Sequence, residues 1–300
     1  MSGKLNTLEE PFTNYGEGNW SPIILVHDDS LITSKKDVGE WAEKKYNLVG
    51  RYCDIFTKSM HRKWNHLVYI DLFAGSGYTR FRNSKKIIRS SPLIALSLPI
   101  PFSEYIFCEK DPELCNALRT RVKRDFADKN VTIIEGDCNE KIDKIISHIP
   151  KYSKSNTVLS FSFVDPFSLN LDFLTIEKLG MYAMDFLILL ALGMDANRNM
   201  ETYLNSSSDK ISKFLNDKDW REKFNKNHSL EHASFVQFLA KEYKKNIERI
   251  KYKSPEDFHE IRSTDKNLPL YHLAFFSKHN LGNDFWKKVQ GYSDGQQKLF

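Results

Sequence analysis

The sequence predicts an α/β protein with a Rossmann-like, mainly parallel sheet, helices on both faces, one antiparallel edge hairpin and a helical insertion. Two observations support this prediction. Five short, almost continuously apolar segments rich in β-branched and aromatic residues alternate with helical segments, which is typical of a parallel sheet buried on both faces. Near the end of the chain, two more β-rich segments are separated by a short turn around Lys266 and Asn267, which indicates a hairpin.

The elements follow one another along the chain. Residues 34–60 are predicted to be helical, because apolar residues such as Val38, Trp41 and Phe56 recur at helical spacing. The predicted strands are 67–73, 104–110, 131–137, 158–167 and 185–193, followed by the hairpin strands 257–264 and 268–279. The predicted helices between them are 91–98, 111–127 and 139–149, and a short helix is expected at 283–293.

The chain divides into an arm and one domain. Residues 1–30 are expected to form an irregular arm, because they contain prolines and several glycines and show no periodicity. Residues 31–300 are expected to form a single α/β domain. Within it, the polar residues at about 195–255 carry apolar stripes at helical spacing and predict a helical insertion on the sheet.

Composition limits the class of protein. The chain has 300 residues, of which 41% are hydrophobic and 28% charged, with a formal net charge of +5, a globular composition compatible with an anionic partner. The longest apolar run, Phe186 to Leu192, is too short to span a membrane. The four cysteines and nine histidines show no metal-binding spacing. We expect no metal site, reduced thiols and a cytoplasmic location.

A glycine turn follows the first strand of the predicted sheet, in YIDLFAGSG at 69–77. It is not a P-loop, because no Lys follows Gly77, and it lacks the third glycine of a dinucleotide fingerprint. A short glycine turn at the carboxyl end of a strand lets a ligand approach the backbone closely.

Acidic residues end four successive predicted strands, namely Asp71, Glu109, Asp137 and Asp165. A single acid at such a place is more often a helix N-cap. Four in register, with the glycine turn on the first strand, favour a cleft for a nucleoside. In that cleft Glu109 is expected to accept the ribose hydroxyls, and Asp137 to meet an adenine amino group.

Together, YIDLFAGSG, CEKDPE, EGD and FVDPF resemble the class I S-adenosylmethionine-dependent methyltransferases. With DVGEWAEKKYNLVGRY, SSPLIAL and LYHLAFFSKHNLGNDFW, the chain from Asp37 to Trp286 more specifically resembles the three-Cys-motif partner (TcmP) family. The resemblance implies S-adenosyl-L-methionine as cofactor and a companion protein that carries the three-cysteine motif. The residues it places at the cofactor are Lys45, Asp71, Phe73, Gly75, Gly77, Glu109 and Asp137.

Asp165, Pro166 and Phe167 are the candidate catalytic residues. In D-P-P-[YFW] methyltransferases, the first residue and the next carbonyl accept amino protons of the target base while the aromatic ring stacks on it. Here the loop is Asp165-Pro166-Phe167-Ser168, so Phe167 replaces the second proline and Ser168 the aromatic residue. A plain turn at the end of a strand is the alternative.

Two sets of basic residues are candidates for anion binding. Lys45 lies inside the apolar stripe of the first helix; it either packs its stem there or contacts the cofactor carboxylate or a substrate phosphate. The resemblance extends distantly to bacterial rRNA adenine-N6 methyltransferases, which have a lysine in a similar place. Arg80, Arg82, Lys85 and Lys86 follow the glycine turn and are expected to overhang the cleft as weak candidates for substrate phosphates.

These observations predict an S-adenosylmethionine-dependent methyltransferase acting on an amino group of a nucleic acid base. The altered Asp165–Ser168 loop keeps a second hypothesis open, a non-catalytic partner or sensor that has the cofactor fold and serves the companion protein. Methylation of a protein or a small molecule is a third.

Overall fold

A seven-stranded sheet forms the centre of the protein. The computed structural model describes the chain except residues 1–19, 206, 228–231, 254–257, 263–268 and 297–300. The strands lie side by side in the order β6 (Val131–Glu135), β5 (Glu104–Glu109), β2 (His66–Asp71), β7 (Val158–Val164), β8 (Met184–Leu190), β10 (Pro269–Phe276) and β9 (His259–Arg262). The first five are parallel, and β10 runs antiparallel to both of its neighbours. This order and the reversed strand define the Rossmann-like methyltransferase fold.

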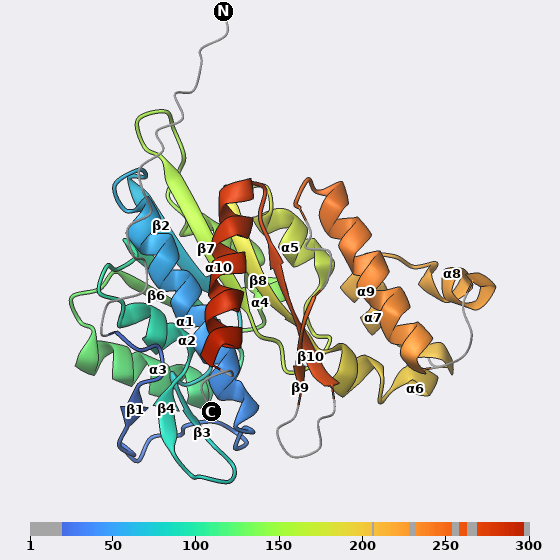
Figure 1. Cartoon of the computed structure of the whole chain (residues 1–300), viewed down its shortest axis with the longest axis horizontal. Helices are drawn as coiled ribbons and strands as arrows, with labels where there is room; N and C mark the ends of the chain where they lie inside the picture. The colour runs from blue at the N-terminus through green and yellow to red at the C-terminus, as the bar shows by residue number, and fades with distance from the viewer. Residues whose placement is uncertain (1–19, 206, 228–231, 254–257, 263–268, 297–300) are drawn as a thin grey trace, which may run out of the picture.

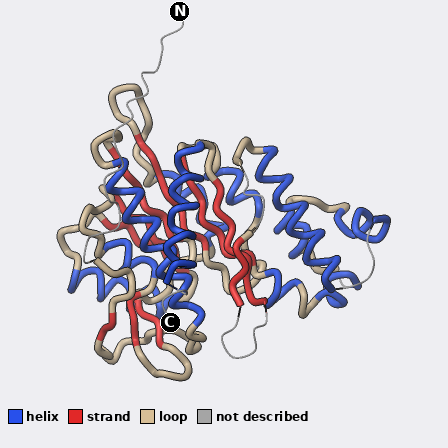
Figure 2. Tube along the Cα trace, in the orientation of Figure 1, coloured by secondary structure: helices blue, strands red, loops and turns tan. Residues whose placement is uncertain are grey.

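Helices cover the sheet, as the sequence predicts. Every residue of β7 and β8 is buried, which requires packing on both faces. In Figure 1, α1 (Trp41–Met60) and α10 (Asn280–Gln296) pack together in front of the strands. The helices between the parallel strands are α2 (Ser91–Leu96), α3 (Pro112–Asp125), α4 (Cys138–Ser147) and α5 (Phe173–Leu179). Figure 2 shows the strands running together between helices.

The helical insertion lies between β8 and β9. It contains a π-helix, η1 (Leu192–Ala196), and then α6 (Met200–Asn205), α7 (Lys210–Leu215), α8 (Trp220–Asn227) and α9 (His232–Arg249). Apolar residues at helical spacing are buried against one another, for example Phe214 stacked on Tyr243 with ring centroids 4.9 Å apart. Figure 1 shows α6 to α9 gathered at one end of the sheet. None of the described helices combines the length and the apolar composition that crossing a bilayer requires.

A small three-stranded sheet beside the central one was not predicted. It consists of β1 (Leu25–Val26), β4 (Ile87–Arg89) and β3 (Tyr78–Arg80), all antiparallel. The expectation of an irregular arm is therefore wrong for Leu25–Val26, and residues 1–19 lie outside the described chain. β1 is hard to predict because its partner β4 is far away in sequence, and β3 and β4 are hard to predict because each has only three residues.

Two helix boundaries also differ from the prediction. The first helix begins at Trp41 instead of residue 34, because the backbone of Val38 bonds to the hairpin: its N–H donates to the Arg80 carbonyl, and its carbonyl accepts from the Arg82 N–H. The last helix is 17 residues long and not short. The predicted turn around Lys266 and Asn267 lies outside the described residues.

Candidate active site

A cleft of about 860 Å³ opens at the carboxyl ends of β2, β5 and β7. This is the edge of an open α/β sheet at which ligands bind, and the volume suits a small-molecule ligand. Of the residues singled out in the sequence, the cleft is lined by Lys45, Phe73, Gly75, Arg82, Glu109, Asp165, Pro166 and Phe167.

The two glycines of the turn have different roles. Gly75 lines the cleft with φ +63°, and a Cβ added there would meet no atom within 4 Å. Gly77 has φ +87° and does not line the cleft; a Cβ there would come within 2.8 Å of the Leu93 side chain. Gly75 therefore leaves room for a ligand, whereas Gly77 allows the turn to pack on α2.

Glu109 joins the end of β5 to the glycine turn. Its Oε2 accepts a hydrogen bond from the Gly75 N–H at 2.8 Å, and its Oε1 accepts one from the Asp111 N–H at 2.7 Å. Burial raises the pKa of this carboxyl, although the two N–H groups lower it. Since an ionised carboxylate has about four acceptor sites, Glu109 keeps capacity for ligand hydroxyls.

Asp137 lies outside the cleft lining and caps a helix. It precedes α4, and its carboxylate accepts from the Asn139 N–H at 3.0 Å and from Lys110 Nζ at 3.0 Å. The structure thus does not bring it to the adenine position expected from the sequence. The N-cap alternative describes its observed contacts.

Asp71 is fully buried beneath the cleft and does not line it. Its Oδ1 accepts from the Phe73 N–H at 3.2 Å, and its Oδ2 accepts from the Tyr69 hydroxyl at 3.3 Å. Burial raises the pKa of this carboxyl to about 7. The structure therefore does not place Asp71 at the surface of the cleft; Asp71 supports the turn from below.

Asp71→Asn should change the pH dependence of stability. The unfolded carboxyl has a pKa of about 3.9 and the folded one about 7, so the folded state holds the proton more tightly. Stability conferred by the protonated acid is complete below about pH 4 and falls as pH rises to about 7. Because the amide that replaces the Asp71 carboxyl stays neutral at every pH, the variant should lose most of this fall in the free energy of unfolding, which amounts to on the order of a few kcal/mol. Urea unfolding of both proteins between pH 5 and 8 would show it; parallel pH curves would contradict it.

Lys45 and Asp165 form an ion pair in the wall of the cleft. The Lys45 Nζ lies 2.5 Å from Asp165 Oδ2, and Lys45 is only 4% exposed. Its ammonium also lies 4.5 Å from the centroid of the Tyr46 ring. Burial lowers the pKa of Lys45, but the Asp165 carboxylate outweighs it and keeps the pKa above its usual value. Lys45 lines the cleft, so its predicted contact to a ligand carboxylate or phosphate stays a prediction.

The loop after β7 is anchored by a residue that the sequence did not indicate. Asp195, in the π-helix η1, accepts hydrogen bonds from the Ser168 hydroxyl at 2.5 Å and the Leu169 N–H at 2.8 Å. Burial raises the pKa of Asp195, but these bonds and those of Tyr203 and Lys210 bring it below its usual value. Single-turn π-helices often lie at functional sites.

Phe167 is held at the mouth of the cleft. Its side chain is 67% exposed, and the Lys36 ammonium lies 5.7 Å from its ring centroid. Trp41 and Tyr271 also line the cleft, and their ring centroids lie 5.0 Å apart. Burial and the nearby Asp165 raise the pKa of Tyr271 to about 12. No motif in the sequence indicated Trp41 or Tyr271 as residues of the site.

Most of the basic loop is used internally. Arg80 Nε and Lys85 Nζ pair with the Asp37 carboxylate at 2.8 and 3.0 Å. Lys86 is exposed but does not line the cleft, and only Arg82 does. The loop therefore mainly binds the N-terminal segment through Asp37. The prediction that its four basic residues overhang the cleft is wrong for all of them except Arg82.

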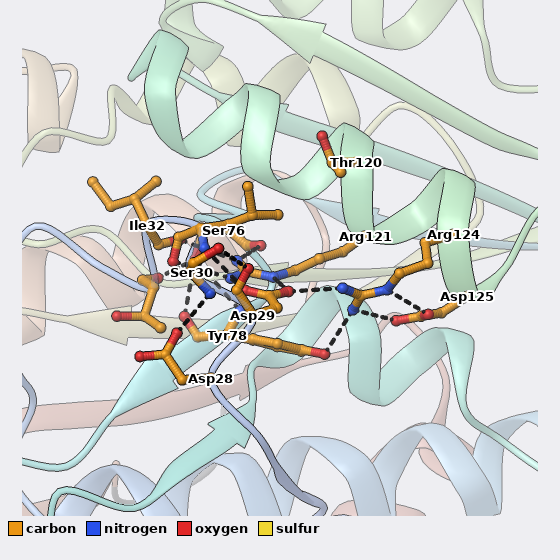
Figure 3. Close-up of polar contacts among 12 residues, drawn as sticks. Asp28, Asp29, Ser30, Ile32, Ser76, Tyr78, Thr120, Arg121, Arg124 and Asp125 are labelled. Atoms are coloured by element: carbon orange, nitrogen blue, oxygen red, sulfur yellow. Dashed lines mark hydrogen bonds and ion pairs between the residues drawn. The ribbon is translucent and has the colours of Figure 1, made fainter.

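Figure 3 shows how the N-terminal segment is fixed against the glycine turn. Arg121, from α3, is fully buried and donates to both oxygens of Asp29, at 2.6 and 2.9 Å. It also donates to the carbonyls of Ile32 and Ser76, and its guanidinium lies 4.0 Å from the Tyr78 ring. Residues 33–41, which follow directly, line the cleft. Arg121 thus holds one wall of the cleft in place.

No group of three or more His, Cys, Asp or Glu side chains that could hold a metal ion gathers in the described part of the chain. All four cysteines are free and buried, and burial raises the pKa of each thiol.

Comparisons with known proteins bear on the fold alone. No protein-family model and no curated protein matches the sequence. Among solved structures, a Legionella pneumophila protein is 10% identical over 82% of this chain and 90% of its own, with a TM-score of 0.48. M. jannaschii TYW2 in complex with AdoMet is 12% identical over 87% and 89%, with a TM-score of 0.39. The O-methyltransferase from Bacillus cereus in complex with SAH is 11% identical over 82% and 84%, with a TM-score of 0.40. These likenesses are distant, and the strand order of this chain is what defines its fold.

Proposed function

We propose that the protein is an S-adenosyl-L-methionine-dependent methyltransferase. The observation that carries the proposal is the cleft at the carboxyl ends of β2, β5 and β7, which has Gly75 and Glu109 on one side and Asp165 on the other. Two of the distant structural neighbours hold this cofactor or its demethylated product, but the proposal for this chain rests on its own residues.

The residues of the cleft fit the cofactor. Gly75 leaves open space at a backbone position that a side chain would fill. Glu109, which has acceptor sites beyond its two N–H partners, would receive the ribose hydroxyls. Phe73 contributes apolar surface to the same wall. When bound, S-adenosylmethionine supplies an electrophilic methyl group on a sulfonium.

Asp165 would hold the acceptor. Its carboxylate is paired with the ammonium of Lys45 and can accept a hydrogen bond from an amino group. Orienting a nucleophile in this way acts on the rate rather than on cofactor affinity. Pro166 and Phe167 follow Asp165 in the lining of the cleft, and the exposed ring of Phe167 offers a flat surface near the Asp165 carboxylate. A planar amino-bearing ring, such as adenine or cytosine in a nucleic acid, suits this arrangement.

One observation favours a second function. The Ser168 hydroxyl is bound to Asp195 and stands where D-P-P-[YFW] enzymes have their stacking ring. A protein with the cofactor fold that serves a companion three-cysteine-motif protein would not need that ring. The TcmP resemblance supports this alternative as well as the enzyme, and a transfer assay with and without the companion separates them.

Glu109→Gln tests the cofactor assignment. A neutral amide replaces the charged acceptor of the ribose hydroxyls. Charge-assisted hydrogen bonds are worth about 1.5–3 kcal/mol, so affinity for S-adenosylhomocysteine in calorimetry should fall about tenfold or more. Asp137→Asn is the matched control, because that acid also ends a strand yet lies outside the cleft lining, and its affinity should stay unchanged. Equal losses in both variants would contradict the assignment.

A further inference from the structure

Three cations around the mouth of the cleft have no acidic partner among the residues that the structure describes. They are Lys36, from the N-terminal segment, Arg82, from the β3–β4 hairpin, and Arg198, which follows η1. All three are exposed and line the cleft. The hydrogen bond of Arg82 goes to the backbone carbonyl of Asp37, at 3.4 Å, and therefore leaves its charge uncompensated.

Most other charges of the cleft wall are paired. The Asp37 carboxylate binds two cations, and Lys35 pairs with Asp111 and Glu113. The carboxylates of Glu40 and Glu109 accept hydrogen bonds only from neutral groups in the described residues and keep their charges. The three unpaired cations outnumber these two acids, which leaves a small excess of positive charge that attracts anions.

An exposed aromatic ring accompanies these cations. Phe167 is 67% exposed, and the Lys36 ammonium lies 5.7 Å from its ring centroid. A stacking ring beside cations is the combination with which proteins bind single-stranded nucleic acids. The three cations belong to separate segments that line the same cleft, so a strand lying across its mouth could contact more than one of them.

We propose that the mouth of the cleft binds single-stranded nucleic acid. Lys36, Arg82 and Arg198 contact phosphates of successive nucleotides, and Phe167 stacks on the base delivered to Asp165. This rests on the proposed function and deepens it, since it names the form of the substrate. It also moves the phosphate contacts away from Arg80 and Lys85, whose charges Asp37 already neutralises.

The test compares two triple variants by fluorescence anisotropy with a labelled single strand of about 12 nucleotides, as DNA and as RNA, with S-adenosylhomocysteine present. In the first variant Lys36, Arg82 and Arg198 are replaced by Gln. In the control variant Gln replaces Lys144, Lys151 and Lys154, which are three exposed lysines outside the cleft lining. The control removes the same charge from the protein at another place.

We expect the first variant to bind at least tenfold more weakly at about 0.1 M salt. The slope of log affinity against log salt concentration should become less steep by about 2, because each of the three lost phosphate contacts contributes about 0.7 to it. The control should bind like the wild type. Phe167→Leu should weaken binding about tenfold without changing the slope, since stacking is not ionic.

Two results would overturn the inference: equal behaviour of the two triple variants, or tight binding of a mononucleotide that the longer strand does not improve. Calorimetry with S-adenosylhomocysteine on the same samples separates this failure from that of the proposed function. If the cofactor binds but the mouth variant is unaffected, only the nucleic acid inference fails. If the cofactor does not bind, the proposed function fails.

Discussion

Asp165→Asn should reduce single-turnover methyl transfer by about 10²- to 10⁴-fold while affinity for S-adenosylhomocysteine changes little. The amide oxygen still accepts a hydrogen bond, but more weakly than the charged carboxylate, and it cannot take up the proton that the amino group loses. General-base and orienting groups typically contribute this much. Cofactor affinity is preserved because Gly75 and Glu109, which are expected to hold the cofactor, remain in place. Quenched-flow transfer of a tritiated methyl group and calorimetry on the same sample would measure both quantities.

The ion pair with Lys45 makes a stability control necessary. In Asp165→Asn, the buried ammonium of Lys45 loses its counter-charge, and removing one partner of a buried pair typically costs about 3–5 kcal/mol. Replacing Lys45 by Met in the same protein removes the orphaned charge. The double variant should therefore regain most of the melting temperature but none of the activity. Recovery of transfer together with stability would show that Asp165 is only structural.

Gly75→Val should abolish cofactor binding, with an affinity loss of at least a hundredfold. The β-branched side chain would occupy the open space of the cleft, and valine is also strained at φ +63°. The strain itself costs on the order of 1–3 kcal/mol of stability, so binding is measured well below the melting temperature of the variant.

Gly77→Ala is the matched control for the turn. Its Cβ would meet Leu93 at 2.8 Å and Leu118 at 3.1 Å, away from the cleft lining. We expect this variant to lose stability but, where folded, to bind the cofactor within a few-fold of the wild type. Abolished binding in both folded variants would mean that the cleft side of the turn has no special role.

The sheet could be predicted because its strands are nearly continuous apolar runs, a signal that is local in sequence. Which strand-end acids face the cleft could not be predicted. Glu109 and Asp165 line it, whereas Asp71 is buried below it and Asp137 caps α4. Four acids at the same edge of a sheet look alike in sequence, and one residue of difference in where a strand ends turns a side chain away.

The parts of the site that the sequence did not indicate depend on distant partners. Asp29 and Arg121 are 92 residues apart, and Ser168 and Asp195 are 27 apart. Neither pair belongs to a sequence motif. Only the fold shows that Arg121 and Asp29 position the N-terminal wall of the cleft, and that Ser168 and Asp195 position the loop of Asp165. The pairing of Lys45 with Asp165 across 120 residues is of the same kind. Lys45 could be singled out in the sequence because a lysine is unusual in an apolar helical stripe, but its pairing with Asp165 could not be predicted.

Single-turnover transfer of a tritiated methyl group from S-adenosylmethionine to single-stranded DNA and RNA is the direct test of whether this protein methylates a nucleic acid base. The wild type is assayed beside Asp165→Asn, with and without a companion three-cysteine-motif protein, and the labelled nucleoside is identified after digestion. We expect label on a base amino group with the wild type, and at most about a hundredth of that rate with Asp165→Asn. A wild type that binds the cofactor yet transfers no label to either nucleic acid, with or without the companion, would contradict it.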